Sequence, residues 1–169
     1  MLNKKDEKIE MEELIEITKS KLDINMLSPL TWAYVGDSVY ELYIRTKLVN
    51  ETNLKPHKLH IEAIKYVKAK AQAELLQKIY DKLSEEEKDI VRRGRNAENH
   101  HLPKNATVEE YKYSTAFEAL IGYLYLTKQD KRLKEILNKC LNWYILAKVC
   151  IFYAFKSVYI IFMENLYKV

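Results

Sequence analysis

Glycine and proline are scarce in this chain, whose 169 residues include three of each. Because both residues disfavour helix interiors, their scarcity predicts long helices joined by short turns. The three glycines, Gly36, Gly94 and Gly122, lie too far apart to build a glycine-rich phosphate loop, which argues against an NTPase or a dinucleotide-binding enzyme. The length is that of one domain with a substantial hydrophobic core.

Cysteine is rarer still. Cys140 and Cys150 lack the paired spacing of a zinc site and lie in apolar sequence, which indicates buried free thiols in a reducing cytosol. The N-terminal residues are charged and contain no apolar run, so we expect no signal peptide and a cytoplasmic protein. The net charge of +4 is compatible with a nucleic-acid partner without establishing one.

Apolar side chains at helical spacing predict an all-α fold. We expect helices over residues 29–48, 57–83 and 131–143, and a loop over residues 95–106, where periodicity is lost and a proline intervenes. No segment has the alternating pattern of a convincing strand.

Two more helix starts are marked by capping boxes. Ser84 and Thr107 are each followed three residues later by a glutamate, Glu87 and Glu110. In this pattern the hydroxyl and the carboxylate satisfy backbone N–H groups at the helix start. We therefore expect a helix from Ser84 to about Gly94 and another that begins at Thr107.

Two acidic residues stand out because their surroundings are apolar and helix-like. Glu118 is the only acid between residues 113 and 126, and Asp37 lies in the apolar segment around residues 33–41. A buried charge is costly unless it is paired, hydrogen-bonded or bound to a metal. The two segments suggest a carboxylate site for a hard cation such as Mg2+, although structural acids paired with Lys or Arg remain an alternative.

Three segments around these acids resemble motifs of a known family. Residues 34–41 (YVGDSVYE) resemble the signature helix of the ribonuclease III superfamily, and residues 117–122 (FEALIG) resemble its second catalytic helix. Residues 92–97 (RRGRNA), followed by 103–106 (PKNA), are similar to the Mini-ribonuclease III branch, which has the nuclease domain without a double-stranded-RNA-binding domain.

The resemblance implies a metal-dependent endoribonuclease that cuts double-stranded RNA and leaves 5′-phosphate ends, with precursor 23S ribosomal RNA as the substrate. It implies that Asp37 and Glu118 are the catalytic metal ligands, for Mg2+ or alternatively Mn2+. Glu41, four residues after Asp37, shares its helix face and is either an outer-shell group or an ordinary ion-pair partner.

The chain departs from the family pattern at two positions. Ala33 and Thr115 stand where ribonuclease III has two further acidic ligands. Fewer protein ligands and more water are therefore expected around the metal, and the number of metal ions stays open. A non-catalytic double-stranded-RNA-binding module with a degenerate nuclease site is the alternative function, and a helical interaction protein is a third.

Basic residues in two places are candidates for RNA contact. Lys68, Lys70 and Gln72 lie in a segment that resembles the family helix facing RNA. A second group near the loop consists of Arg92, Arg93, Arg95 and Lys104. A reader of duplex RNA needs contacts to phosphates and 2′-hydroxyls, but lysines that merely solvate a helix are the plainer reading.

The resemblance also implies a homodimer in which two protomers pair through the signature helix. Large rings suit such an interface, so the helix aromatics Trp32, Tyr34, Tyr40 and Tyr43 are candidates, although Trp32 is also expected to pack in the core with Phe117. A ribosomal protein on the substrate is a further candidate partner.

By this reasoning the chain has three parts. Residues 1–26 form a polar N-terminal extension, residues 27–144 a ribonuclease III-like catalytic domain, and residues 145–169 an apolar tail of uncertain role. The tail is marginal as a membrane span. A packed helix is the favoured interpretation of the tail, and membrane contact or extra sequence without a function stay open as alternatives.

Overall fold

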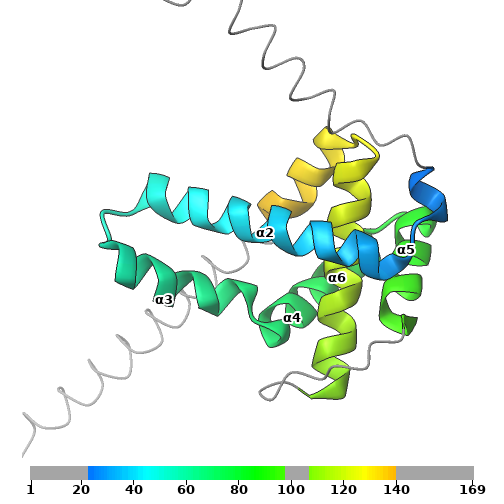
Figure 1. The fold of residues 1–169 in the computed structure, drawn as a ribbon, viewed down its shortest axis with the longest axis horizontal. Helices are drawn as coiled ribbons and strands as arrows, with labels where there is room; N and C mark the ends of the chain where they lie inside the picture. The colour runs from blue at the N-terminus through cyan, green and yellow to red at the C-terminus, as the bar shows by residue number, and fades with distance from the viewer. Residues whose placement is uncertain (1–22, 98–106, 140–169) are drawn as a thin grey trace, which may run out of the picture.

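The computed structural model describes residues 23–97 and 107–139 (Figure 1). All secondary-structure elements within these residues are helices, which confirms the all-α prediction. Most of the polar extension, Lys104, both cysteines and the apolar tail lie outside the described residues. The element order is η1 (Ile24–Met26), α2 (Pro29–Glu51), α3 (Pro56–Val67), α4 (Ala69–Ile79), η2 (Tyr80–Lys82), α5 (Glu85–Asn96) and α6 (Val108–Leu126). Residues 130–139 are also helical.

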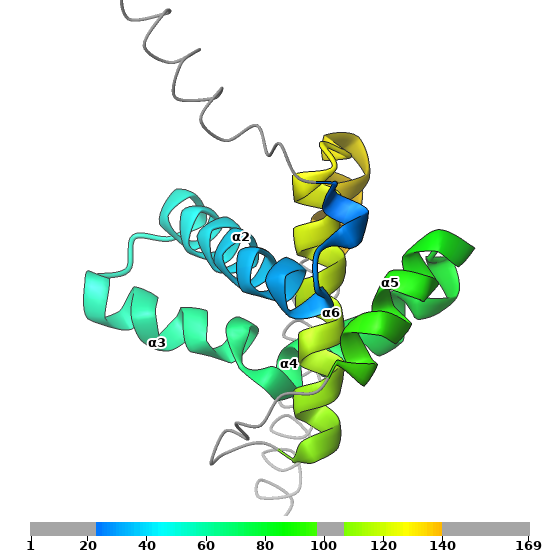
Figure 2. The same ribbon diagram turned by 45° about the vertical axis from the view of Figure 1, so that its right-hand side comes forward.

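Helix α6 is the centre of the described fold. Helices α2, α4 and α5 all pack against it, and α3 packs on α2 and α4. Figures 1 and 2 show α6 crossed by α2 on one side and flanked by α5 on the other. The apolar side of α6 is therefore surrounded, which explains why its residues from Ala119 to Leu124 are buried almost without interruption.

The helix starts follow the capping signals. The Ser84 Oγ accepts a hydrogen bond from the Glu87 N–H at 3.2 Å, and Glu87 accepts one from the Ser84 N–H at 2.8 Å. Thr107 and Glu110 repeat this reciprocal arrangement at 3.1 and 2.9 Å. Both predicted capping boxes are thus confirmed.

The expected single helix over residues 57–83 is wrong in one respect, because the chain turns at Lys68. This residue has an extended backbone (φ −66°, ψ 147°) that ends α3 and begins α4, and the last residues form the short helix η2. The turn lets α3 lie on α2 while α4 lies on α6. Each half keeps a helical apolar spacing, so periodicity alone does not reveal the break.

Two glycines allow α2 and α6 to cross with their backbones in contact. A Cβ added to Gly36 would lie 1.8 Å from the Glu118 carbonyl oxygen, and one added to Gly122 would lie 1.9 Å from the Trp32 carbonyl oxygen. Glycine in a helix interior costs about 1 kcal/mol relative to alanine, and here the close crossing offsets that cost. The crossing brings the Asp37 segment against the Glu118 segment.

Aromatic side chains fill the core around this crossing. The rings of Tyr40 and Phe117 meet edge to face with centroids 5.0 Å apart, and those of Trp32 and Tyr123 with centroids 5.2 Å apart. The expectation that Trp32 and Phe117 pack in the core is confirmed, since both are fully buried.

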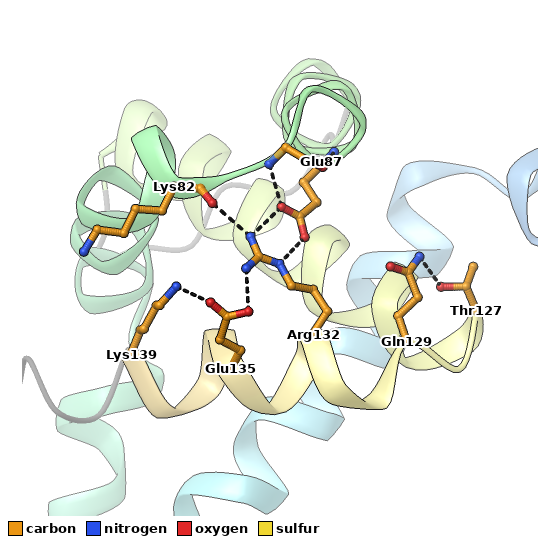
Figure 3. A network of polar contacts seen from close by, with 8 residues as sticks. Lys82, Glu87, Thr127, Gln129, Arg132, Glu135 and Lys139 are labelled. Carbon is orange, nitrogen blue, oxygen red and sulfur yellow. Dashed lines mark hydrogen bonds and ion pairs between the residues drawn. The ribbon is translucent and has the colours of Figure 1, made fainter.

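An ion-pair network fastens residues 130–139 to the start of α5 (Figure 3). The Arg132 guanidinium donates to both carboxylate oxygens of Glu87, at 2.6 and 2.8 Å, and to the Lys82 carbonyl oxygen at 2.9 Å. It also donates to Glu135 at 2.7 Å, and Glu135 accepts from Lys139. Burial opposes the ionisation of Glu87, but the bonds from Arg132 and Ser84 outweigh it and hold the pKa of that carboxyl below its usual range.

Within the part of the chain that the structure describes, we find no helix with the length and apolar character needed to cross a membrane.

Candidate active site

The crossing of α2 and α6 places two carboxylates from distant parts of the chain beside each other. Asp37 follows Gly36 on α2, and Glu118 lies one turn before Gly122 on α6. The backbone of Gly36, next to Asp37, packs against the Glu118 carbonyl oxygen, and the Asp37 carboxylate contributes to the raised pKa of Glu118. The crossing glycines are therefore the local reason that the carboxylates meet.

Both acids are held in surroundings that oppose their negative charge. Burial raises the pKa of Glu118 to about 8, with a further contribution from the Asp37 carboxylate. Asp37 is exposed to solvent at the surface of α2, and partial desolvation still raises its pKa, with a further contribution from the neighbouring Glu41. A cation bound between two such acids would favour the ionised form of both, so the pair has the chemistry of a candidate cation site.

Asp37 and Glu118 have no ion-pair partner among residues 23–97 and 107–139. The alternative in which these acids are structural and paired with Lys or Arg therefore has no support in the described residues. Glu41 differs, because the Arg45 guanidinium donates to its carboxylate at 2.5 Å across one helical turn. The structure thus places Glu41 in the ion-pair role that was one of its two expected roles.

The donor set fits Mg2+ better than a metal that needs a full protein cage. No group of three or more His, Cys, Asp or Glu side chains gathers anywhere in the described ranges. Mg2+ is commonly bound through one or two carboxylates, with waters and substrate phosphates as its other ligands. Ala33 and Thr115, at the family's acid positions, are both buried beside this site and add no carboxylate.

Gln72, which the sequence analysis named as a candidate for RNA contact, is buried in the structure. Its side chain is 1% exposed, so the expectation that it faces RNA beside Lys68 is not met by this structure. It interacts instead with the Glu118 carboxylate, whose ionised form it favours. A signal for this position existed in the sequence, since a lone amide occupies an otherwise apolar stripe of α4.

Lys68 and Lys70, by contrast, are exposed at the turn between α3 and α4. They lie near the start of α6, where they add to the Thr107 backbone N–H in lowering the pKa of Glu110. These two cations are thus placed where a polyanion could reach them.

The arginines of α5 point in different directions. Arg92 and Arg95 share a face that lines a cavity of about 600 Å³ with Tyr113, where Arg92 pairs with Asp89 and the Arg95 guanidinium lies 5.8 Å from the Tyr113 ring centroid. Arg93 points away from this cavity and stacks 4.4 Å from the Trp32 ring centroid. The structure therefore brings Arg92 and Arg95 together and separates Arg93 from them.

Comparison with known proteins gives one family. The Ribonuclease III domain model matches residues 30–129. Relatives named Mini-ribonuclease 3 include proteins from Thermoanaerobacter sp. (strain X514), 58% identical over 70% of this chain and 84% of the relative, and from Enterococcus faecalis, 49% identical over 71% and 92%. A Staphylococcus aureus relative of the same name is 47% identical over 70% and 90%.

A solved structure is also similar. The crystal structure of a Fusobacterium nucleatum protein superimposes with a TM-score of 0.66 at 35% identity, covering 72% of this chain and 98% of that chain. The similarity therefore extends from the sequence motifs to the arrangement of the helices.

Proposed function

Because this chain belongs to the ribonuclease III family, and within it to the Mini-ribonuclease 3 group of endoribonucleases, we propose that it cleaves double-stranded RNA with a divalent metal held by Asp37 and Glu118. One observation carries the proposal. Two acids from separate helices come together where glycines let the helices cross, the charge of Asp37 acts on Glu118, and no cation among the described residues pairs with either of them. A bound divalent cation is the natural partner of such a pair.

The residues of the chain then have distinct tasks. Asp37 and Glu118 would bind the divalent metal through their carboxylate oxygens and so hold it at the α2–α6 crossing. When bound, Mg2+, or alternatively Mn2+, supplies an activated water and neutralises charge on the scissile phosphate. Water adds to phosphorus while the bond to the 3′-oxygen breaks, which leaves a 5′-phosphate and a 3′-hydroxyl.

The RNA duplex would be held by exposed cations on both sides of the start of α6. Lys68 and Lys70 project from the α3–α4 turn, and Arg92 and Arg95 from α5. Lys104 belongs to the same proposed surface but lies outside the described residues. Arg93, which stacks on Trp32, is the weakest member of the group.

Precursor 23S ribosomal RNA is the substrate that we propose, on the basis of the motifs in residues 34–41, 92–97 and 117–122. A ribosomal protein bound to that RNA is the accompanying candidate partner. The relatives' names extend only to a ribonuclease, so this assignment rests on the motif resemblance.

We further propose a homodimer that buries an apolar stripe of α2. Tyr34, Leu42 and Val49, spaced by about two turns, are 79%, 67% and 60% exposed. The structure corrects two of the expected interface residues, because Trp32 and Tyr40 are buried in the protomer core. A two-fold axis would place this stripe against its own copy.

Sedimentation tests the dimer. Leu42→Glu introduces a charge into the stripe without touching the core, so it should shift the protein from dimer to monomer at micromolar concentration. Lys58→Glu on α3, an exposed change of charge outside the stripe, is the control. A wild-type monomer that still cuts both strands would refute the dimer and leave the nuclease assignment standing.

Cleavage of long duplex RNA with Mg2+, with and without a chelator, tests the activity. Asp37→Asn and Glu118→Gln should each abolish cleavage but retain RNA binding, and Glu41→Gln should retain both. Duplex binding without any metal-dependent cleavage by the wild type would favour the non-catalytic module. Wild-type rates in Asp37→Asn would remove Asp37 from the site.

A further inference from the structure

Gln72 is an anomaly in the face that α4 turns toward α6. The residues at positions 72, 75, 76 and 79 form a helical stripe, and Leu75, Leu76 and Ile79 are buried apolar members of it. Gln72, equally buried, carries an amide into the same interface. Neither its Nε2 nor its Oε1 makes a hydrogen bond of normal geometry within the described residues.

The burial of this amide does not help the fold. A buried polar group without a hydrogen-bond partner costs about 1–3 kcal/mol, and an apolar residue at position 72 would fill the stripe as its neighbours do. A partner for this amide in the working state of the protein would remove that cost.

The polar group beside Gln72 is the Glu118 carboxylate. Helix α4 packs against α6, which carries Glu118, and the buried amide of Gln72 lies in that interface within interaction range of the Glu118 carboxylate. The two side chains do not form a hydrogen bond of normal geometry. The other charged group that acts on Glu118 is Asp37, and it is repulsive.

We propose that Gln72 is a positioning residue, whose side-chain N–H groups donate to the Glu118 carboxylate and hold it toward Asp37 for joint binding of a divalent cation. This inference rests on the proposed function. Carboxylates that bind metals are commonly held by such outer hydrogen bonds, and the loss of one costs about 10–100-fold in metal affinity or activity. A small side-chain rotation, which cation binding would favour, completes the hydrogen bond.

The burial of Gln72 separates this role from the one predicted from the sequence. A side chain that is 1% exposed offers no surface to a duplex. Lys68, at the exposed turn before α4, would touch RNA in the proposed complex. Gln72 would not touch the RNA and would act by orienting the Glu118 carboxylate.

Mn2+ binding to the full-length protein without RNA, measured by electron paramagnetic resonance, tests the inference. Gln72→Met keeps the length of the side chain and removes the donor, so Mn2+ affinity should fall about 10-fold. The metal-free protein should be at least as stable as the wild type, because an unsatisfied buried amide is lost. A residue with a merely structural role would not combine unchanged stability with weaker metal binding.

Leu76→Met is the matched control, since it changes the same helix face with an unbranched side chain but touches no donor. It should bind Mn2+ like the wild type. Gln72→Leu offers a second apolar replacement if Gln72→Met does not fold, with the same expected loss of affinity.

The outcomes separate this inference from the proposed function. Wild-type Mn2+ affinity in Gln72→Met or Gln72→Leu overturns the positioning role alone, provided that Asp37→Asn abolishes binding. Failure of the wild-type protein to bind Mn2+, or equal binding by Asp37→Asn, overturns the proposed metal site and the role of Gln72 with it.

Discussion

Replacement of Glu118 by glutamine should stabilise the metal-free protein at alkaline pH while it abolishes cleavage. Burial and the Asp37 carboxylate raise the pKa of Glu118 from 4.5 to about 8. The carboxylate is therefore held in the protein at a cost in folding free energy, which the proposed cation would offset. Glutamine has nearly the same shape and carries no charge, so it removes that cost.

The sign of the effect follows from the protons bound in each state. Between about pH 4.5 and pH 8, the unfolded chain has released the Glu118 proton while the folded protein still holds it. Folding then takes up a proton, so the free energy of unfolding of the wild type falls as the pH rises through this interval. Glu118→Gln has no such dependence at this position.

The pKa change sets an upper limit on the effect. Each tenfold change in an ionisation equilibrium is worth about 1.4 kcal/mol, so a rise from 4.5 to about 8 corresponds to at most about 5 kcal/mol. Glu118 is partly exposed, and solvent screening reduces this, so we expect about 2 kcal/mol at about pH 8. For a chain of this size that is a rise of about 4–8 °C in Tm.

Urea and thermal denaturation of both proteins with a chelator present, at about pH 5 and about pH 8, measure the difference. The stability gain of Glu118→Gln should be small at the lower pH and should grow toward the higher one. Glu41→Gln, which removes a carboxylate already paired with Arg45, should show no such growing gain. A difference between wild type and Glu118→Gln that is independent of pH would refute the argument.

Three further predictions follow from the packing and the charges. Gly122→Ala forces a Cβ to within 1.9 Å of a backbone oxygen, so it should cost more than about 3 kcal/mol in urea denaturation; a loss below about 1 kcal/mol would mean that the helices part easily. Arg132→Met leaves Glu87 buried and unpaired, at a cost of about 3 kcal/mol; because the pKa of Glu87 is depressed in the fold, this stabilisation should be present at neutral pH and be lost as the pH falls through that pKa. Replacing Arg92 and Arg95 with glutamine should reduce the log–log salt dependence of duplex binding by about 1.8 if each contacts one phosphate, by analogy with DNA, and an unchanged slope would assign them to a solvated surface.

The positions of helices and their ends could be predicted because the signals are local. The capping boxes at Ser84 and Thr107 depend on side chains three residues apart, and the structure contains both. Asp37 and Glu118 could also be singled out from their neighbours in the sequence, since an acid that is buried with an apolar helical segment needs a partner wherever that helix packs. The motif resemblance then identified the family.

What the helix spacing could not decide is which side of each helix faces which neighbour. Tyr34 and Tyr40 looked equivalent in the sequence, yet Tyr40 is buried and Tyr34 is exposed, because α6 covers only one face of α2. Arg93 parts from Arg92 and Arg95 for the same reason, since the helix surface that it occupies is turned toward Trp32.

The sequence by itself therefore determined the all-α class, the capped helix starts and the two acids that are proposed as metal ligands. Only the tertiary structure decided that the chain turns at Lys68, that glycine on α2 and α6 lets those acids meet, and that Gln72 lies beneath Glu118 instead of facing outward. The physical reason is that capping and propensity act within a few residues of the chain. Helix crossings are set by the side chains of segments about 80 residues apart, whose contact no local pattern contains.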